Sequence, residues 1–190
     1  MELILIRHGR PERSAESSDP PLDASGKDQA RRVGAALARE RIDAVVSSTM
    51  RRAVQTALPF AEAAGLRIAQ HEGLVEWDRD AGSYTPMEVL KRDNYPAWQA
   101  FVARGQDAGA LALFQQTVVA ALEGVVAAHP GRRVAVFCHG GVINVWTAHI
   151  LEMRPRLFFE PQYASIHRYL CASTGQRNLL SLNDVAHLRD

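Results

Sequence analysis

Apolar and polar residues alternate in blocks along this chain, in the order expected of strands that alternate with helices. Short apolar runs ending in turn-forming residues predict strands at residues 3–6, 44–46, 66–69, 134–138, 165–171 and 179–183. Apolar residues at helical spacing predict helices at residues 23–41, 51–64, 85–104, 110–129 and 142–151. This pattern predicts an α/β fold: a three-layer α/β/α sandwich with a mostly parallel central sheet, in which the last two strands form a hairpin.

Capping and stop signals set the expected ends of the helices. Asp23 is expected to cap the first helix, and Gly65 is expected to end the second. Pro59 lies inside that second helix and predicts a kink or a local break. In the third helix, Thr85 is the expected cap and Pro86 the expected first helical residue.

No repeat or linker divides the chain, and 190 residues suit one domain with its own core. We therefore predict a single domain over residues 1–190. Residues 74–109 contain the most irregular stretch and predict a variable lid or insertion. Trp77, Tyr84, Tyr95 and Trp98 cluster in it, and the favoured interpretation is a small satellite core beneath the lid. The alternative is that Trp77 or Tyr84 borders a substrate.

Composition narrows the setting but names no ligand. Apolar residues make up 47% of the chain, charged residues 23%, and the formal net charge is +1. This balance provides no global field for nucleic acid or for a membrane surface, so any attraction for an anion must be local. Cys138 and Cys171 both lie in apolar runs and are expected to be buried, reduced thiols. With no expected signal peptide or membrane-spanning run, we expect a cytoplasmic protein.

Two predicted strands end in the same kind of signature. Residues 3–6 lead into Arg7-His8-Gly9, and residues 134–138 lead into His139-Gly140-Gly141. In a parallel sheet both histidines would emerge at the edge where ligands bind. Glycine after each histidine permits a sharp turn and a close approach of the backbone to a ligand.

The residues around these histidines favour an anion over a metal ion. Two histidines are too few for a closed zinc site, and Arg7 beside His8 would repel a cation. A guanidinium group can bind two phosphate oxygens at once. Arg52 is a second candidate for this role, because it lies where a strand leads into a helix. We expect at least one of Arg51 and Arg52 to point into the site. The alternative is that both are solvated helix charges.

Together these motifs resemble the histidine phosphatase superfamily, also called the phosphoglycerate-mutase-like superfamily. Arg7-His8-Gly9 after an apolar strand matches its hallmark, and four motifs occur in the family's order between residue 3 and about residue 145. The other matching residues are Leu22, Gly26, Gln29 and Ala30 in the first helix, Arg52, Ala53, Gln55, Thr56 and Ala57 in the second motif, Leu74 and Glu76 before the lid, and residues 136–142 with His139.

The resemblance implies a role for each of these residues. His8 would attack phosphorus and become phosphohistidine, while Arg7, Arg52 and a protonated His139 would surround the phosphoryl oxygens. Glu76 would protonate the leaving oxygen and later deprotonate water. The implied activity is metal-independent hydrolysis of a phosphomonoester, with a small phosphorylated metabolite as substrate and no cofactor. The alternatives are a mutase-type phosphotransferase and a non-catalytic module that binds a phosphorylated ligand.

The chain departs from the family pattern at two places. The segment after Glu76 lacks the Gly-x-x-Glu-Gly run that often follows the proton donor, so Asp78 and Asp80 are alternative donors. Arg10-Pro11 replaces the small polar residue and asparagine of mutases, which argues against phosphoglycerate mutase proper. Arg10 is either a third cation for an acidic substrate or a solvated charge. The sequence names neither the substrate nor the oligomeric state.

Overall fold

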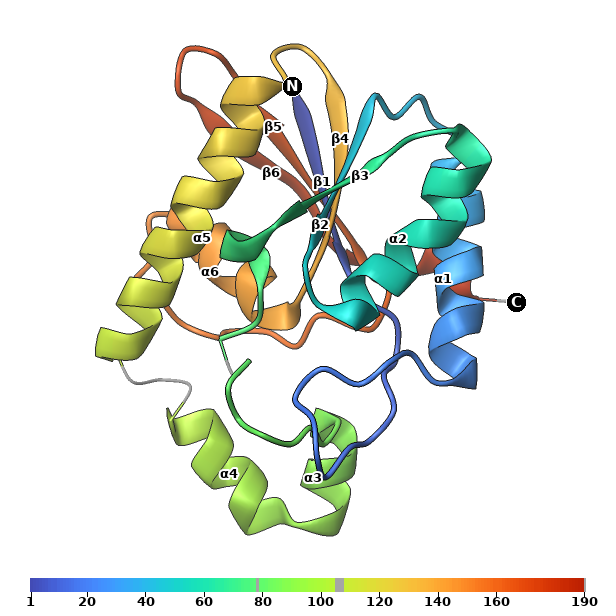
Figure 1. Ribbon diagram of the computed structural model, residues 1–190. Coiled ribbons are helices and arrows are strands. Elements are labelled where there is room, and N and C mark those ends of the chain that lie inside the picture. The colour runs from blue at the N-terminus through green and yellow to red at the C-terminus, as the bar shows by residue number, and fades with distance from the viewer. Residues whose placement is uncertain (78, 105–107, 190) are drawn as a thin grey trace.

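A computed structural model describes residues 1–77, 79–104 and 108–189. One mixed sheet of six strands forms its centre, in the order β3-β2-β4-β1-β5-β6 (Figure 1). The four strands from β3 to β1 run parallel, whereas β5 is antiparallel to β1 and β6 to β5. The strands are β1 Glu2–Arg7, β2 Ala44–Ser48, β3 Ile68–His71, β4 Arg133–Cys138, β5 Ile166–Cys171 and β6 Arg177–Asp184. The predicted fold class and the terminal hairpin are confirmed.

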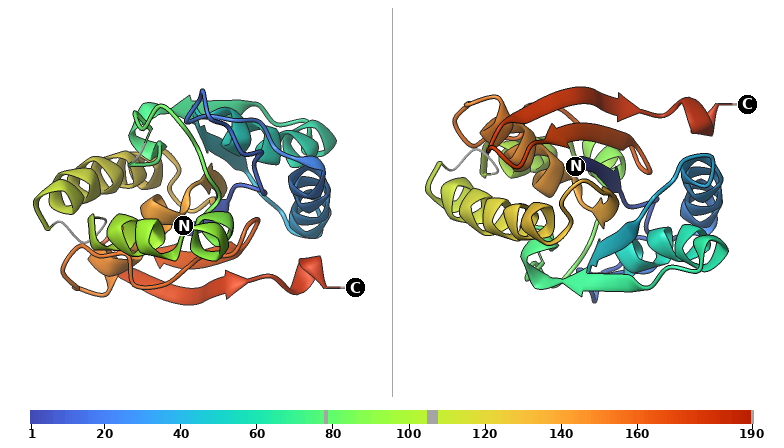
Figure 2. Two further views of the ribbon diagram at one scale, coloured as in Figure 1. Left: turned by 90° about the horizontal axis from the view of Figure 1, so that it is seen from below. Right: turned by 90° about the horizontal axis from the view of Figure 1, so that it is seen from above.

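Helices cover both faces of this sheet. In Figures 1 and 2, α1 and α2 lie together on one side, α5 and α6 lie on the other, and α3 and α4 lie beyond one edge. The α-helices are α1 Ala24–Leu37, α2 Arg51–Ala64, α3 Met87–Asp93, α4 Tyr95–Arg104, α5 Ala108–Ala128 and α6 Gly140–Ile150, and the 3-10 helices are η1 Glu72–Leu74 and η2 Ala186–Leu188.

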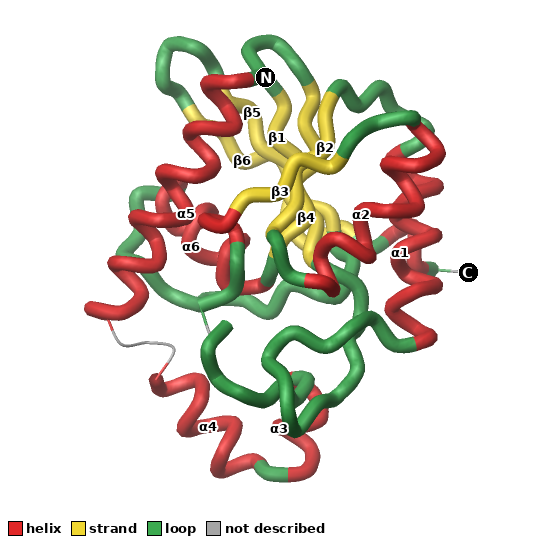
Figure 3. The backbone as a smooth tube through the Cα atoms, viewed as in Figure 1, coloured by secondary structure: helices red, strands yellow, loops and turns green. Residues whose placement is uncertain are grey.

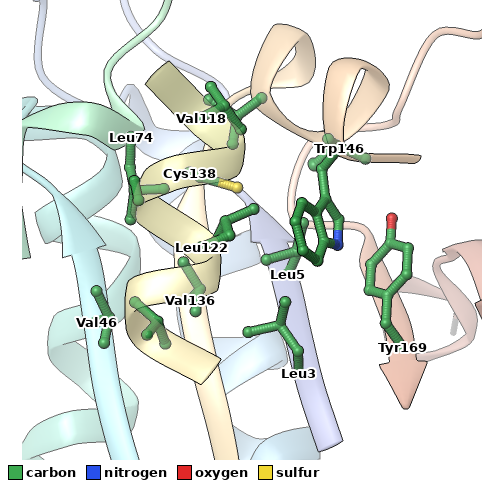
Figure 4. Packing of buried hydrophobic residues seen from close by; sticks show 14 of the residues in the cluster. Leu3, Leu5, Val46, Leu74, Val118, Leu122, Val136, Cys138, Trp146 and Tyr169 are labelled. Carbon is green, nitrogen blue, oxygen red and sulfur yellow. The ribbon is translucent and has the colours of Figure 1, made fainter. Parts of the chain in front are cut away.

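The core explains why β1 is apolar at successive positions. Leu3 and Leu5 pack in the cluster that contains residues of α5 and α6, whereas Ile4 and Ile6 pack in the cluster that contains residues of α1 and α2. Strand side chains alternate between faces, so a central strand covered on both sides is apolar throughout. Figure 4 shows the first cluster, with Trp146 of α6 against β1. This packing holds the carboxyl end of β1 firmly in the middle of the sheet.

Two helix boundaries differ from the prediction, and an expected break inside a helix is missing. The first helix ends at Leu37, although Asp23 does cap it by accepting a hydrogen bond from the Gly26 N–H at 2.7 Å. α2 continues through Pro59 without a break. Thr85 is not the cap of α3, because Pro86 occupies that position and makes no side-chain cap bond.

The predicted helix over residues 85–104 is two helices separated at Asn94. A continuous helix would push the ring of Pro96 into the carbonyl of Arg92. The chain instead leaves the helix at Asn94, whose side chain accepts a hydrogen bond from the Ala97 N–H at 3.1 Å. Pro96 then lies in the first turn of α4, where a missing N–H costs nothing. That the whole chain is one domain, with residues 74–109 as a variable lid, stays a prediction.

We expected no run of membrane-spanning length, and α5 differs from that expectation. Its residues Gly109–Ala128 are long and apolar enough to cross a membrane by length and composition. That is weak evidence, since core helices pass the same test. Its residues Val118 and Leu122 lie in the cluster on the sheet (Figure 4).

The fold brings two distant segments together at the carboxyl edge of the sheet. β1 and β4 are neighbours in parallel register, and Arg7 lies opposite Cys138. His8 and His139 therefore leave the sheet side by side, as predicted. Figure 3 shows loops below this edge, between the sheet and the pair of helices α3 and α4.

Candidate active site

His8 is buried at the end of β1 and is held in one tautomer. Its Nδ1 lies 2.8 Å from the carbonyl oxygen of Gly9, and its Nε2 accepts a hydrogen bond from Arg52 Nε at 3.3 Å. Since a carbonyl only accepts, Nδ1 carries the proton and Nε2 keeps its lone pair. Burial, then Arg52 and Arg7, hold the pKa of His8 well below its usual value. The imidazole is therefore neutral and nucleophilic at neutral pH.

Arg52 enters the site from the first turn of α2, whereas Arg51 is exposed. Arg52 Nη1 donates to the Ser18 carbonyl at 2.8 Å and lies 3.4 Å from Asp19 Oδ1. The guanidinium also lies over the ring of Tyr84, 4.9 Å from its centroid. Because these contacts hold the group on several sides, its position is fixed before any ligand binds.

Arg7 approaches His8 from the last position of β1. Its Nη1 donates to the carbonyl of Pro161, and its guanidinium carbon lies 4.1 Å from the centroid of the Tyr163 ring. The Tyr163 hydroxyl donates to Glu88 of α3 at 3.3 Å. The loop before β5 thus holds the arginine through two residues, Pro161 and Tyr163, and the second of these contacts α3.

His139 lies behind His8, with the two ring centroids 5.1 Å apart. Its Nε2 lies 2.8 Å from Ser48 Oγ, at the end of β2. We expected a protonated His139, and the structure differs. Burial, then Arg52, His8 and Arg7, lower the pKa of His139 well below its usual value, so the ring is neutral here. A neutral ring still supplies one N–H donor.

Three buried nitrogen atoms around His8 have no hydrogen-bond partner within the described parts of the chain. They are Arg7 Nε, Arg52 Nη2 and His139 Nδ1. Buried polar groups are normally paired, and each unpaired group costs stability. The two arginine nitrogens are donors, and His139 Nδ1 is a third when Ser48 donates its hydroxyl proton to His139 Nε2. Such a group of donors suits a ligand with several anionic oxygens.

Glu76 reaches the same place from the segment after η1. Its Oε2 accepts the N–H of Gly141 at 3.0 Å, and its Oε1 accepts the N–H of Trp77 at 3.1 Å. The first of these bonds lies at the N-terminus of α6, where the helix dipole favours an anion. A Cβ atom at Gly141 would lie 2.1 Å from Glu76 Oε1, so the glycine makes room for the carboxylate.

The other candidate residues fall in different places. Asp80 lines the same cavity but is exposed, and Asp78 lies outside the described residues. Arg10 does not line the cavity, and its Nε lies 3.3 Å from Asp23 and 3.7 Å from Glu88. The structure thus brings His8, Glu76, Arg7 and Arg52 to one cavity wall with His139 behind. The chemical role of each residue stays a prediction.

The cavity at this edge has a volume of about 800 Å³ and extends from His8 to the helices α3 and α4. Trp77, Tyr84 and Trp98 line it, whereas Tyr95 stacks on Trp98 and is half exposed. The structure favours the alternative interpretation of these aromatic residues, because they border the space where a substrate would lie. They do not form a separate satellite core.

The sequence assigned no role to three residues that shape the site, although Ser48 lies in the matched second motif. Ser48 contacts His139, and Tyr163 packs on Arg7. Asn144 is buried in α6, one turn after Gly140, and bonds the segment at Phe158 and Phe159. A lone amide in an apolar helix was the available signal for Asn144. Tyr163 carried no motif.

The fold and the unpaired nitrogen atoms around His8 fit an α/β enzyme of phosphoryl transfer. The sequence profile of the histidine phosphatase superfamily (branch 1) matches residues 3–185. The chain is 30% identical to phosphoserine phosphatase 1 of Hydrogenobacter thermophilus, over 99% of this chain and 94% of that protein. It is 25% identical to a probable phosphoglycerate mutase GpmB of Yersinia enterocolitica, over 82% of this chain and 77% of that protein.

A solved structure agrees with this assignment at the level of the fold. The phosphoserine phosphatase of Entamoeba histolytica, in complex with 3-phosphoglyceric acid, superposes with a TM-score of 0.77 and 22% identity over 99% of both chains. The chain therefore belongs to the histidine phosphatase superfamily, as its motifs predicted. It is a phosphatase-type member, a phosphomonoester hydrolase.

Proposed function

We propose that this protein hydrolyses small phosphorylated metabolites through a phosphohistidine on His8, with Glu76 as proton donor and no metal ion. One observation carries the proposal: the lone pair of His8 Nε2 lies beside Arg52, among buried donors that have no partner in the described chain. In phosphoryl transfer most of the catalytic effect comes from positioning and from compensating charge on the equatorial oxygens.

Two steps complete the proposed reaction. His8 Nε2 bonds to phosphorus as the ester P–O bond breaks, and Glu76 gives its proton to the leaving alcohol. Water then attacks the phosphohistidine, Glu76 takes a proton from it, and the P–N bond breaks to release phosphate and restore His8. Arg7, Arg52 and His139 would donate hydrogen bonds to the phosphoryl oxygens throughout.

The proposed reaction takes its charge compensation from side chains and not from a metal ion. The described residues contain no group of three or more histidine, cysteine, aspartate or glutamate side chains that could hold a metal ion. The arginines take the place of a cation beside the nucleophile.

We also propose a cytoplasmic location, since Cys138 and Cys171 are buried free thiols.

The direct test is to trap the intermediate. The enzyme is mixed with a phosphomonoester, quenched in base within milliseconds, and the modified peptide is located by mass spectrometry. We expect phosphate on His8, activity that resists a chelator, and a fall in kcat/KM of at least about 10³-fold in His8→Ala. Full activity in His8→Ala, or its complete loss with chelator, would refute the proposal.

The same assay separates hydrolysis from phosphotransfer. Labelled substrate is turned over with excess alcohol acceptor, such as glycerol. A hydrolase releases the label as inorganic phosphate alone, whereas a mutase-type enzyme places it on the acceptor.

A further inference from the structure

We propose, building on the phosphatase function above, that the substrate's leaving group is an uncharged and largely apolar alcohol. Phosphate esters of alkyl or aromatic alcohols would fit better than esters that carry a carboxylate, such as phosphoserine or phosphoglycerate. The proposal follows from the walls of the cavity beyond the phosphoryl position.

The helices of the lid give the cavity an apolar surface, beside the polar Asp80, Ser83 and Thr85 of the segment before them. Met87 and Leu90 from α3 and Trp98 from α4 line the cavity. The Tyr95 ring stacks on the Trp98 ring, with 5.2 Å between their centroids. Lys91 Nζ lies over the Trp98 ring as well, 4.8 Å from its centroid. Because Trp98 is held on its outer side, it offers a fixed apolar surface to a bound molecule.

The opposite wall is apolar too, and it is fixed to α6. Phe158 and Phe159 line the cavity, and their rings lie 5.0 Å apart. Asn144 Oδ1 accepts the N–H of Phe158 at 2.8 Å and of Phe159 at 3.2 Å, and Nδ2 donates to the Phe159 carbonyl at 3.0 Å. Three hydrogen bonds from one buried amide thus hold this aromatic wall in place.

The charges of the cavity argue against a second anionic group. Among the described lining residues the cations are Arg7 and Arg52, and both stand beside His8, where the phosphoryl group binds. The lining carboxylates away from the phosphoryl position are Asp80 and Glu160. Beyond the phosphoryl position a substrate carboxylate would meet aromatic rings, these acids and the hydroxyls of Ser83 and Thr85, but no lining cation to compensate its charge.

The cavity is also larger than a minimal substrate needs. Its volume of about 800 Å³ lies in the range of pockets that enclose drug-sized ligands, roughly 300–1,000 Å³. A longer apolar leaving group would bury more of these walls than a three-carbon acid does. Each buried methylene should strengthen binding by roughly fourfold.

Binding of phosphonates tests this without requiring turnover. Ethyl-, butyl- and hexylphosphonate are compared by calorimetry with 2-amino-3-phosphonopropionate, the phosphonate analogue of phosphoserine. We expect hexylphosphonate to bind at least about tenfold more tightly than ethylphosphonate, and the phosphoserine analogue to bind more weakly than butylphosphonate. An affinity independent of chain length, or the phosphoserine analogue as the tightest ligand, would overturn the proposal.

Three variants localise the effect. Trp98→Ala and Phe158→Ala should each reduce the hexyl-to-ethyl affinity ratio by at least about threefold. Leu113→Ala removes an exposed leucine of α5 outside the cavity, and it should leave that ratio unchanged. If both wall variants behave like Leu113→Ala, the apolar walls do not hold the leaving group and the proposal fails.

The outcome separates this inference from the proposed function. If affinity rises with chain length but no ester is hydrolysed through His8, the proposed function fails and the ligand class stands. If esters are hydrolysed through His8 but butyl phosphate is turned over less efficiently than phosphoserine, the function stands and the ligand class is wrong.

Discussion

In the proposed reaction His8 is the nucleophile, and its own surroundings activate it. The Gly9 carbonyl fixes the proton on Nδ1, and Arg52 faces the lone pair on Nε2. Burial is the main cause of the low pKa of His8, and the arginines that would bind phosphate lower this pKa further, because a neighbouring cation disfavours a second positive charge. The arginines therefore contribute both to the neutrality of His8 and to the expected anion binding.

The tautomer and charge of His8 can be measured directly. Nitrogen-15 NMR at pH 6.5 should show a neutral His8 with its proton on Nδ1. Arg52→Gln should raise the pKa of His8, because a positive neighbour that lowers it is removed, although burial keeps it below 6.5. Arg51→Gln, at the exposed neighbouring position, should leave this pKa unchanged. A His8 that is protonated at pH 6.5 would contradict the assignment.

Glu76 can be distinguished from Asp80 by the leaving group. Glu76→Gln should lower kcat/KM, which reports the steps up to release of the leaving group, by about 10²–10⁴-fold for an alkyl phosphate, because an alkoxide needs a proton as it leaves. For p-nitrophenyl phosphate the loss should be much smaller, since its phenolate leaves unprotonated. Asp80→Asn, which alters an exposed carboxylate in the same cavity, should stay within about threefold for both substrates. The reverse pattern would make Asp80 the donor.

At the scale of elements, the site depends on close contact between the loop after β1 and the first turn of α1. A Cβ atom at Gly26 would lie 2.0 Å from the carbonyl oxygen of Arg10, and one at Gly9 would lie 2.6 Å from the Gly26 oxygen. Only glycine permits the backbones to approach so closely. This contact places the residues that follow His8.

Gly26→Ala should therefore force the loop and the helix apart. We expect a loss of about 1–3 kcal/mol in the free energy of unfolding, measured with urea, and a clear fall in kcat/KM. Gly124→Ala is the matched control, because nothing lies within 4 Å of its added Cβ on α5. There alanine should raise stability by about 0.5–1 kcal/mol. An unchanged free energy of unfolding in Gly26→Ala would show that the two backbones can move apart at little cost.

Across the whole molecule, neutral histidines link stability to pH. His167 is buried between Ser165 and the Asn183 N–H, and burial, then Arg7, lowers its pKa to about 3. The unfolded chain, with a pKa near 6.5, binds this proton more readily. The contribution of His167 to stability is therefore complete above pH 6.5 and is lost as the pH falls from 6.5 toward 3.

Urea unfolding at pH 4, 5, 6 and 7 checks this linkage. As the pH is lowered from 6 to 4, the free energy of unfolding should fall by about 1.4 kcal/mol per pH unit for each such histidine. His167→Gln should reduce the slope by that amount, and His187→Gln, at a half-buried site, should reduce it less. An unchanged slope in His167→Gln would mean that His167 is protonated in the folded protein.

Periodicity and motif order were enough to predict the class of fold and which residues gather at the carboxyl edge of the sheet. Parallel strands end at the same edge of a sheet, so the order of strands and helices was enough to predict that His8 and His139 meet. Helix ends were less predictable, because Pro86 and Pro96 take different roles that depend on where the chain turns. The aromatic residues of the lid were assigned to the wrong environment, since no local pattern says which side of a ring faces a cavity.

The sequence by itself determined the sheet, the histidine pair and the family, because these depend on local spacing that survives in any member of the fold. Only the tertiary structure decided the charge of His139, the tautomer of His8 and the apolar walls around Trp98 and Phe158. Charge and pocket shape depend on burial among residues far apart in the chain. For Arg7-His8-Gly9, the sequence therefore predicts a nucleophile, and the packing around it makes that nucleophile neutral.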